Sequence, residues 1–441
     1  MDASKQRSRP ERLGLILLLM LAAGLRLAVI LMHPDELTQD RDAYLGIATG
    51  VAQGRGFSSP GSTQPTAYRP PLYPLMLAAG LMAFPAPIVV AGINLVAGVL
   101  GVWLTERLGD LLKLGRSRFL AAGLVAVDPM LLRYVSQPMT ESVCTLLAVL
   151  WIWSASLALT SPNGRAWCRW LFSGLSFGLL VLCRPTFWPI VLFWYGGSYL
   201  VHRRQRSDNR GSAWGSLASQ WICGATGTAL VVGPWIVRNW WVLGVPILTT
   251  THGGYTLFLS NNPVFYQEVV QQPWGTVWQN QSLTEWQADI ESQIQQQLGA
   301  EASEVARDKW YSQQGRRTIA AEPQLFAKAT LHRVRSLWNT VPQGEAAEQV
   351  SGNLVLAIGW YYGAILILGF CGAILIGAGR GSTTWLPLYA MIVTVQLAHL
   401  VYWTNARMRA PLTPAISLFV AGAVSRSVRP REVSPPDHGT E

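Results

Sequence analysis

The chain has 441 residues, of which 50% are hydrophobic and only 13% are charged. A soluble domain carries about 25% charged residues, so this composition excludes an ordinary soluble protein. Apolar runs recur along the chain at about 20 residues, the length that a helix needs to cross the hydrocarbon core of a membrane. Because unpaired backbone groups are too costly in lipid, these runs indicate an all-α polytopic membrane protein.

The net charge of +10 could suggest a nucleic-acid-binding protein. The basic residues, however, stand in short clusters between the apolar runs, as the positive-inside rule expects. We therefore exclude nucleic acid as a partner and expect contacts with membrane lipids. The five cysteines form no CxxC pair and lie in or beside apolar runs, which argues against a disulfide framework or a metal site. Neither a metal nor a cofactor is predicted.

The apolar runs predict about ten transmembrane helices, with both termini in the cytoplasm. The expected spans are 13–32, 87–108, 117–136, 139–160, 167–183, 185–201, 217–241, 353–378, 384–403 and 409–426. A further apolar stretch at 71–84 is short and is interrupted by prolines. If this stretch does not cross, every basic cluster falls in a cytoplasmic loop, so we expect an interfacial or re-entrant helix there.

This topology predicts how the chain is divided. The resulting domains are a cytoplasmic tail at 1–12, a transmembrane region at 13–241 with an outer loop at 33–86, an outer loop subdomain at 242–352, C-terminal transmembrane helices at 353–426 and a disordered cytoplasmic tail at 427–441. The first outer loop is expected to be amphipathic. The outer subdomain is expected to be polar and helical, because residues 267–325 are rich in Gln, Glu and Ala.

Ionisable residues near the membrane boundary are functional candidates, because such groups are expensive there. In the first outer loop, Asp40 and Asp42 precede Tyr44. Tyr44, Ile47 and Ala48 share one helical face, which predicts a short helix over 42–53 on the membrane surface. Asp40 at its start is either an N-cap or part of a site, and the residues alone leave both readings open.

Arginines accumulate on the predicted outer side, against the positive-inside bias. They are Arg69, Arg184, Arg238, Arg407 and Arg409. Snorkelling to lipid head groups explains one or two of them, whereas a shared anionic ligand explains the set, because Arg binds phosphate with a rigid fork of donors. Glu141 opens the fourth span, where it either favours the helix N-terminus or belongs to a site. His252 precedes two glycines at the start of the large outer loop, as either a turn residue or a ligand contact.

Motifs for nucleotide-binding or hydrolase domains are missing from the sequence: there is no Walker motif, no GxGxxG after a strand, no HExxH and no GxSxG. A substrate that is already activated must therefore supply the energy for any reaction at the outer face.

The order of the motifs resembles the polytopic glycosyltransferases of the GT-C fold, a superfamily that includes the protein O-mannosyltransferases (glycosyltransferase family 39-like) and the lipid A aminoarabinose transferases. The matching motifs are Asp40 to Ala48 with Gly54-Arg55-Gly56-Phe57, Tyr68-Arg69-Pro70-Pro71, Thr140-Glu141, Arg184-Pro185, Pro234-Trp235 with Arg238-Asn239, and Arg407 with Arg409 and Pro411. They extend over nearly the whole chain.

The resemblance implies an inverting transfer of a monosaccharide from a polyprenyl-phosphate-linked sugar to a hydroxyl of a glycan, lipid or protein acceptor. It places the protein in the plasma (inner) membrane, with the active site on the non-cytoplasmic side. The acidic residue of the family aligns best with Asp40. Arg41 stands where the family often has Glu, and Asp42 follows, so either aspartate could be the base. Arg69 replaces a Lys that faces the lipid phosphate in the lipid A enzymes.

The predicted site therefore has three groups of residues. They are Asp40 and Asp42 as catalytic candidates, Arg69, Arg184, Arg238 and Arg407 for the donor phosphate, and Tyr44, Tyr68, Glu141, Asn239 and His252 for the substrate. The chemistry of these residues supports such a transfer independently of the resemblance. One carboxylate can take the proton of the acceptor, and arginines can stabilise the leaving phosphate. Two alternatives remain, namely a lipid-linked glycan polymerase or ligase, and a non-enzymatic transporter of lipids or anions.

Overall fold

The computed structural model describes residues 8–160, 166–205, 210–278, 280–344, 347, 350–378 and 383–428. These residues form helices and connecting turns. Within this part of the chain the only β pairing is an isolated bridge between Ser58 and Pro65. The expected all-α polytopic class is therefore confirmed.

Seven of the described helical segments are long and apolar enough to cross a membrane, or eight if a bent pair counts as one span. The seven are α1 (Arg9–Met32), α4 (Ala86–Leu111), α7 (Glu141–Leu159), α8 (Ala166–Cys183), the apolar part of α10 (Arg210–Leu243), α17 (Gly352–Ala378), and a segment made of η6 (Ala406–Leu412) and α19 (Thr413–Val428). The pair consists of α5 (Ser117–Val127) and α6 (Pro129–Arg133) with η2 (Tyr134–Ser136), bent by 41°.

The other two expected spans are short helices. α9 (Ile190–Gln205) has 16 residues, and α18 (Leu386–Ala398) has 13 residues after the short turn η5 (Thr383–Trp385). A straight crossing needs about 20 residues, so length alone does not assign these two helices as spans. Described helices therefore lie at all ten expected positions. Seven or eight of them have the length of a full span, so the number of about ten spans is not confirmed.

A buried arginine stabilises the bend between α5 and α6. Arg26 of α1 is 1% exposed and donates hydrogen bonds to the carbonyl oxygens of Val125 (3.3 Å) and Ala126 (3.1 Å). Asp128 then begins α6 by accepting the N–H of Leu131 at 2.9 Å. Backbone groups that a helix break frees at membrane depth must find partners, and these two side chains supply them.

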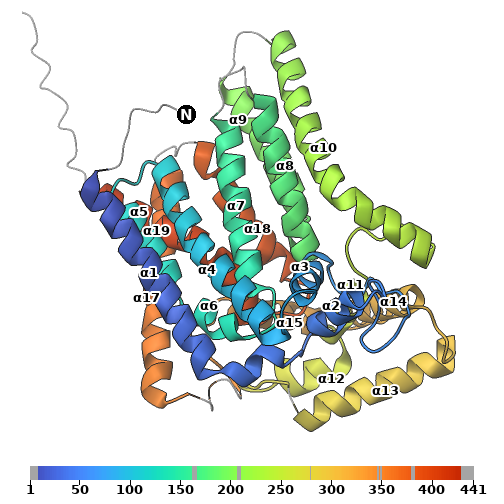
Figure 1. Ribbon diagram of the computed structural model, residues 1–441. Coiled ribbons are helices and arrows are strands. Elements are labelled where there is room, and N and C mark those ends of the chain that lie inside the picture. The colour runs from blue at the N-terminus through green and yellow to red at the C-terminus, as the bar shows by residue number, and fades with distance from the viewer. Residues whose placement is uncertain are drawn as a thin grey trace, which may run out of the picture.

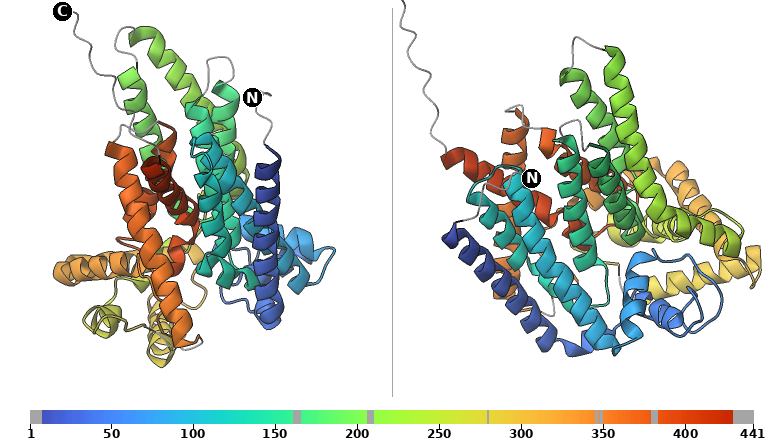
Figure 2. Two further views of the ribbon diagram at one scale, coloured as in Figure 1. Left: turned by 90° about the vertical axis from the view of Figure 1, so that its left-hand side faces the viewer. Right: turned by 45° about the horizontal axis from the view of Figure 1, so that its top comes forward.

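The loop segments between the spans gather at one end of the bundle. Figure 1 shows α2 (Tyr44–Ala52), α3 (Leu72–Leu81), α11 (Gly253–Leu259) and α13 (Asn280–Leu298) at the lower end, opposite the start of α1. The views in Figure 2 agree with this arrangement. This lower end corresponds to the predicted outer side, and it holds both large outer segments.

The two short helices of the first loop pack on each other. α3 has 10 residues, which makes it about 15 Å long and too short to cross, in agreement with the expectation for 71–84. α2 buries the predicted face that contains Tyr44, Ile47 and Ala48. Tyr44 meets Tyr73 of α3 edge to face, with ring centroids 5.5 Å apart. The face of α2 is therefore covered by protein.

The second outer segment is helical and has a small core of its own. Its further helices are α12 (Pro263–Phe265), the π-helical turn η4 (Tyr266–Val270), α14 (Glu304–Ala321) and α15 (Pro323–Leu337). Outside this segment, the short turn η3 (Pro185–Phe187) lies between α8 and α9. Its core contains the buried rings of Phe258, Phe265, Trp286 and Trp310. Most of the tail expected to be disordered at 427–441 lies outside the described residues, as do residues 1–7 of the expected N-terminal tail.

Candidate active site

Asp40 and Asp42 lie in the same turn but contact different partners. The carboxylate of Asp40 accepts the backbone N–H groups of Leu45 (2.9 Å) and Gly46 (2.6 Å) at the start of α2. A carboxylate is favourable at this positive end of a helix. Ala43 has a left-handed backbone with φ of 63°, and Asp42 contacts two arginines instead of α2. The structure thus gives Asp40 the capping role.

Asp42 lies between two arginines from distant parts of the chain. Its Oδ1 is 3.2 Å from Nη2 of Arg69, and its Oδ2 is 3.4 Å from both terminal nitrogens of Arg407. Burial by itself would raise the pKa of Asp42, but the charges of Arg407 and Arg69 outweigh burial and hold the pKa below its ordinary value. Asp42 is therefore ionised at neutral pH.

Glu141 opens α7 and is 1% exposed. Its Oε1 is 2.6 Å from Nη2 of Arg184 and 3.2 Å from Nε of Arg407. Arg184, which directly follows α8, also donates from Nε to the hydroxyl of Thr140 at 2.9 Å. A carboxylate buried without a partner would be strongly destabilising, and two guanidinium groups offset that cost. Arg407 of η6 thus contacts both Glu141 and Asp42.

We call Asp42, Arg69, Glu141, Arg184 and Arg407 the arginine–carboxylate cluster. It contains three guanidinium groups and two carboxylates, so its net charge is +1. Nε of Arg69 and Oε2 of Glu141 are buried and have no hydrogen-bond partner among the described residues. Buried polar atoms are normally hydrogen-bonded, so the free donor of Arg69 and the surplus positive charge suit an anionic ligand, whereas the free oxygen of Glu141 is an acceptor and suits a hydrogen-bond donor.

The described residues bring no group of three or more His, Cys, Asp or Glu side chains together in a way that could hold a metal ion. The two carboxylates of the cluster are joined by the guanidinium of Arg407.

Aromatic side chains continue from the cluster toward the outer subdomain. The guanidinium of Arg69 lies 5.5 Å from the ring centroid of Tyr44 and 5.0 Å from that of Tyr68, within the range of cation–π attraction. Tyr68 meets His252 with ring centroids 4.4 Å apart, and His252 stacks on Tyr255 at 5.1 Å. Burial and the charge of Arg69 lower the pKa of His252 to about 3, so this imidazole is neutral at physiological pH. Tyr44, Tyr68 and His252 are therefore neighbours of the cluster, and their contact with a substrate stays a prediction.

Arg238 and Asn239 do not join the cluster. Arg238 donates to the carbonyl oxygens of Thr66 (2.7 Å) and Phe57 (2.6 Å), and Asn239 donates to that of Ile247 (3.0 Å). Their donors hold the backbone of the two outer segments, and within the described part of the chain neither side chain pairs with Asp42 or Glu141. Of the four arginines predicted to bind phosphate, the structure brings together Arg69, Arg184 and Arg407.

Two carboxylates of α14 hold backbone near the cluster and were not identified from the sequence, and one of them, Glu304, connects the two outer segments. Glu304 accepts the backbone N–H of Ala67 at 2.9 Å and the hydroxyl groups of Thr66 and Thr251. Asp308, one turn further along α14, accepts the N–H of Gly254 at 2.7 Å. These contacts fix residues next to Tyr68 and Arg69 on one side and next to His252 on the other.

The sequence carried little signal for this pair of carboxylates. Glu304 and Asp308 are spaced four apart, which places both on one face of a helix. They lie, however, in a segment where Gln and Glu are common on every face, so their partners in 57–69 and 249–254 become visible only in the fold.

A search of solved structures places this arrangement in a known fold. The apo oligosaccharyltransferase of Archaeoglobus fulgidus aligns with a TM-score of 0.52 and 15% identity, over 93% of this chain and 50% of that chain. ArnT of Cupriavidus metallidurans bound to undecaprenyl phosphate aligns with a TM-score of 0.44 and 11% identity, over 93% of this chain and 77% of that chain. No protein-family model and no curated protein matches the chain.

The chain thus has the GT-C fold that its motifs led us to expect. It spans about half the length of the Archaeoglobus enzyme.

The Glu304 contacts give the first testable prediction. Glu304→Gln leaves one acceptor oxygen for three converging donors, and a donor left without a partner costs about 1–3 kcal/mol. We expect faster amide hydrogen exchange in 57–69 and in 249–254, measured by mass spectrometry, together with a lower unfolding temperature in detergent. Glu301→Gln, an exposed carboxylate in the preceding turn, is the matched control. Equal exchange in the two variants would show that Glu304 does not hold these segments.

Proposed function

We propose that the chain is an inverting glycosyltransferase that moves a monosaccharide from a polyprenyl-phosphate donor to an acceptor hydroxyl. We further propose that it acts on the non-cytoplasmic side of the plasma membrane, because the cluster lies at the end of the bundle that the positive-inside rule assigns to that side. The single observation that carries the proposal is the arginine–carboxylate cluster, in which three guanidinium groups and an ionised aspartate converge at one end of a GT-C fold.

Arg69, Arg184 and Arg407 are proposed to hold the phosphate of the donor. When the glycosidic bond to phosphate breaks, the leaving polyprenyl phosphate gains negative charge. Guanidinium groups that are already in place stabilise this charge without further reorganisation. Their planar forks also fix the orientation of the phosphate oxygens. Glu141, which contacts Arg184 and Arg407, is proposed to position these two side chains.

Asp42 is proposed to act as the general base. The acceptor hydroxyl transfers its proton to the Asp42 carboxylate and forms a bond to the anomeric carbon. The bond from that carbon to the phosphate oxygen breaks on the opposite face, which inverts the configuration, and polyprenyl phosphate leaves with the bonding electron pair. Asp42 suits this role better than Asp40, because the carboxylate of Asp40 is occupied by the backbone of α2.

Donor binding would strengthen this base. Arg407 and Arg69 hold the pKa of Asp42 below its ordinary value. A bound phosphate partly neutralises the same two guanidinium groups, so the pKa of Asp42 rises when the donor is present. A carboxylate with a higher pKa accepts a proton more readily, and proton transfer is thereby coupled to the presence of the donor.

The charge of the cluster favours a donor linked through one phosphate. A polyprenyl-phosphate sugar is a phosphodiester with a single negative charge, which balances the net charge of +1 in the cluster. A diphosphate-linked donor brings a second negative charge, and buried charge without a partner is costly. This balance separates the proposed transferase from a ligase or polymerase that uses diphosphate-linked glycans. The acceptor is proposed to be a hydroxyl of a glycan, lipid or protein.

The second prediction separates the two aspartates. Asp42→Asn removes the base, and general base catalysis is worth about 10²–10⁴-fold in rate. Asp40→Asn leaves one acceptor oxygen for the N–H groups of Leu45 and Gly46, so it weakens the start of α2 but keeps Asp42 as the base. In a deletion strain that carries each variant, we expect unused polyprenyl-phosphate sugar to accumulate with Asp42→Asn and not with Asp40→Asn. Mass spectrometry of the lipid-linked sugars is the measurement, and normal membrane levels of both proteins are the control. The reverse pattern would assign the base to Asp40.

The third prediction concerns pH. The dependence of kcat/KM on pH reports the pKa of the free enzyme. Because the pKa of Asp42 is held below its ordinary value, we expect the acid limb for the wild-type protein below about pH 4, the ordinary range of aspartate. Arg407→Gln removes the larger lowering charge, so the pKa of Asp42 rises and the acid limb moves to higher pH. Arg55 lies in the same outer loop as Asp42 but outside the cluster, so Arg55→Gln should leave the acid limb in place. An unmoved limb in Arg407→Gln argues against Asp42 as the titrating base.

The fourth prediction tests the charge balance. We expect purified protein to bind farnesyl phosphate methyl ester, a phosphodiester, at least as tightly as farnesyl diphosphate, as measured by isothermal titration. Glu141→Gln raises the net charge of the cluster to +2 and should shift the preference toward the diphosphate. A preference for the diphosphate in the wild-type protein would favour a ligase or polymerase.

A further inference from the structure

The turn η6 contains two arginines with different partners. Arg407 contacts the carboxylates of the arginine–carboxylate cluster. Arg409 is 2% exposed and donates to the carbonyl oxygens of Leu337 (3.0 Å) and Asn339 (2.9 Å), at the end of α15 and just after it. The guanidinium of Arg409 also lies 4.5 Å from the ring centroid of Tyr362 in α17, within the range of cation–π attraction. Arg409 therefore joins η6 to the outer subdomain and to a membrane-spanning helix.

The hydroxyl of Tyr362 connects this contact to a buried carboxylate. It donates to Oδ1 of Asp128 at 3.1 Å and accepts the N–H of Met130 at 3.1 Å. Asp128 is fully buried, and the same Oδ1 accepts the N–H of Leu131 at 2.9 Å. We call Asp128, Tyr362 and Arg409 the Asp128 network. It joins α6, α17 and η6 at one place in the bundle.

The same carboxylate also orients a ring that faces Arg407. Asp128 caps α6, a helix of only five residues, and η2 follows that helix directly with Tyr134. The guanidinium of Arg407 lies 5.8 Å from the ring centroid of Tyr134, again within cation–π range. Asp128 therefore reaches Arg407 by two routes, one along the Asp128 network and η6, the other along α6 and η2.

The turn η6 has few internal bonds that could fix its own side chains. It is a 3₁₀ helix of seven residues, it has no side-chain cap at its start, and it contains Pro411, which lacks an N–H. Hydrogen bonds in 3₁₀ helices have poorer geometry than those in α-helices. The direction in which Arg407 points thus depends on the contacts that other elements make with η6, and Arg409 makes contacts of this kind.

The Asp128 network is more than a filling of the interior. Oδ2 of Asp128 and Nη2 of Arg409 are buried and have no hydrogen-bond partner among the described residues. Ionisable groups at membrane depth are expensive, and apolar residues of similar volume often replace buried charged groups without loss of stability. The polar network adds direction, because hydrogen bonds fix angles as well as distances.

We propose that Asp128 is a positioning residue that holds Arg407 against Asp42 and Glu141, through the Asp128 network and through α6. The inference rests on the proposed function, in which Arg407 binds the donor phosphate. When the network is broken, η6 loses an anchor and the guanidinium of Arg407 moves away from Asp42.

Two neighbouring tyrosines of α17 provide a matched pair of variants. The hydroxyl of Tyr361 donates to the carbonyl oxygen of Leu124 in α5 at 2.8 Å. Tyr361→Phe and Tyr362→Phe therefore each remove a hydroxyl that joins α17 to the bent pair of α5 and α6. Tyr362→Phe alone cuts the link between Asp128 and Arg409.

The test measures the pKa of the Asp42 carboxylate by infrared titration of purified protein in detergent, with the signal assigned by Asp42→Asn. Arg407 lowers this pKa, and a change in stability alone does not move it. We expect Tyr362→Phe to raise the pKa of Asp42 by about one pH unit, the lower end of the effect of a neighbouring arginine. Tyr361→Phe should leave the wild-type value. Equal values in the two variants would overturn the proposal.

Asp128 itself is tested by two substitutions that both remove its ionisable group. The amide oxygen in Asp128→Asn can still accept from Leu131 and Tyr362, whereas Asp128→Leu offers no acceptor. We expect Asp128→Leu to raise the pKa of Asp42 and Asp128→Asn to restore most of the wild-type value. An unchanged pKa in Asp128→Leu, or the same rise in both variants, would contradict the positioning role. If Asp128→Leu does not fold, the tyrosine pair decides alone.

The infrared titration needs no turnover, so it separates this proposal from the proposed function. If the pKa of Asp42 rises in Tyr362→Phe while no glycosyl transfer is found in the strain assay, the proposed function fails and the Asp128 network stands. If transfer is found while Asp42 has the same pKa in both tyrosine variants, only the positioning role of Asp128 fails.

Discussion

The guanidinium of Arg407 makes the contact on which the arrangement of the outer segments depends. It comes from η6, near the end of the chain, and contacts Asp42 of the first outer loop and Glu141 at the start of α7. Two carboxylates brought this close together would repel each other, and Glu141 is almost fully buried. The guanidinium cation between them removes the repulsion. It thereby holds the first loop, α7 and the last span in one geometry.

Around this contact, residues of the same chemical type serve two different purposes. Asp40, Glu304 and Asp308 accept backbone N–H groups and hold loops, whereas Asp42 and Glu141 form ion pairs with guanidinium groups. The arginines divide in the same way. Arg26 and Arg238 donate to carbonyl oxygens, while Arg69, Arg184 and Arg407 face carboxylates. The groups that hold the backbone keep the others in place, so the charged cluster can remain partly unsatisfied.

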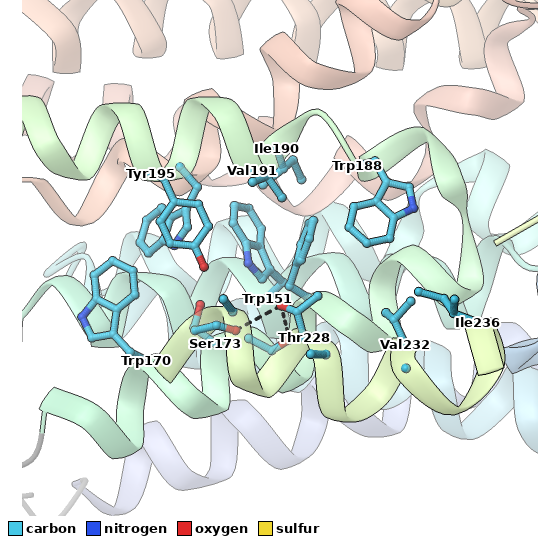
Figure 3. Close-up of a pocket in the computed structure, with 17 residues that line it drawn as sticks. Trp151, Trp170, Ser173, Trp188, Ile190, Val191, Tyr195, Thr228, Val232 and Ile236 are labelled. Carbon is cyan, nitrogen blue, oxygen red and sulfur yellow. Dashed lines mark hydrogen bonds between the residues drawn. The ribbon is translucent and has the colours of Figure 1, made fainter. Parts of the chain in front are cut away.

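An aromatic cavity of about 340 Å³ lies between α7, α8, α9 and α10, and Figure 3 shows side chains that line it. α8 connects this cavity with the cluster, because Arg184 follows its last residue and Trp170 and Phe177 lie along its length. The chain thus passes from a charged to an apolar environment between Arg184 and Trp188, within about one helical turn.

The sequence by itself determined the membrane class and the positions of the helices, and it predicted the end of the bundle at which the candidate site lies. These features follow from the length of apolar runs and from the placement of basic clusters, both of which are properties of short stretches of chain. It also indicated that acidic and basic residues of the first loop, of Thr140-Glu141 and of Arg407 belong to one site. The family motifs carried that inference, since their residues are far apart in the sequence.

Only the tertiary structure decided which residue takes which part. Asp40 and Asp42 are two positions apart, and the left-handed backbone at Ala43 separates a helix cap from a cluster residue. Arg238 and Arg407 look alike in sequence and differ in the groups that the fold brings to them. The Glu304 contacts and the aromatic cavity had no sequence signal, because each is made of side chains from several segments. Composition and spacing describe one segment at a time, whereas the direction of a side chain and its neighbours depend on the packing of the whole chain.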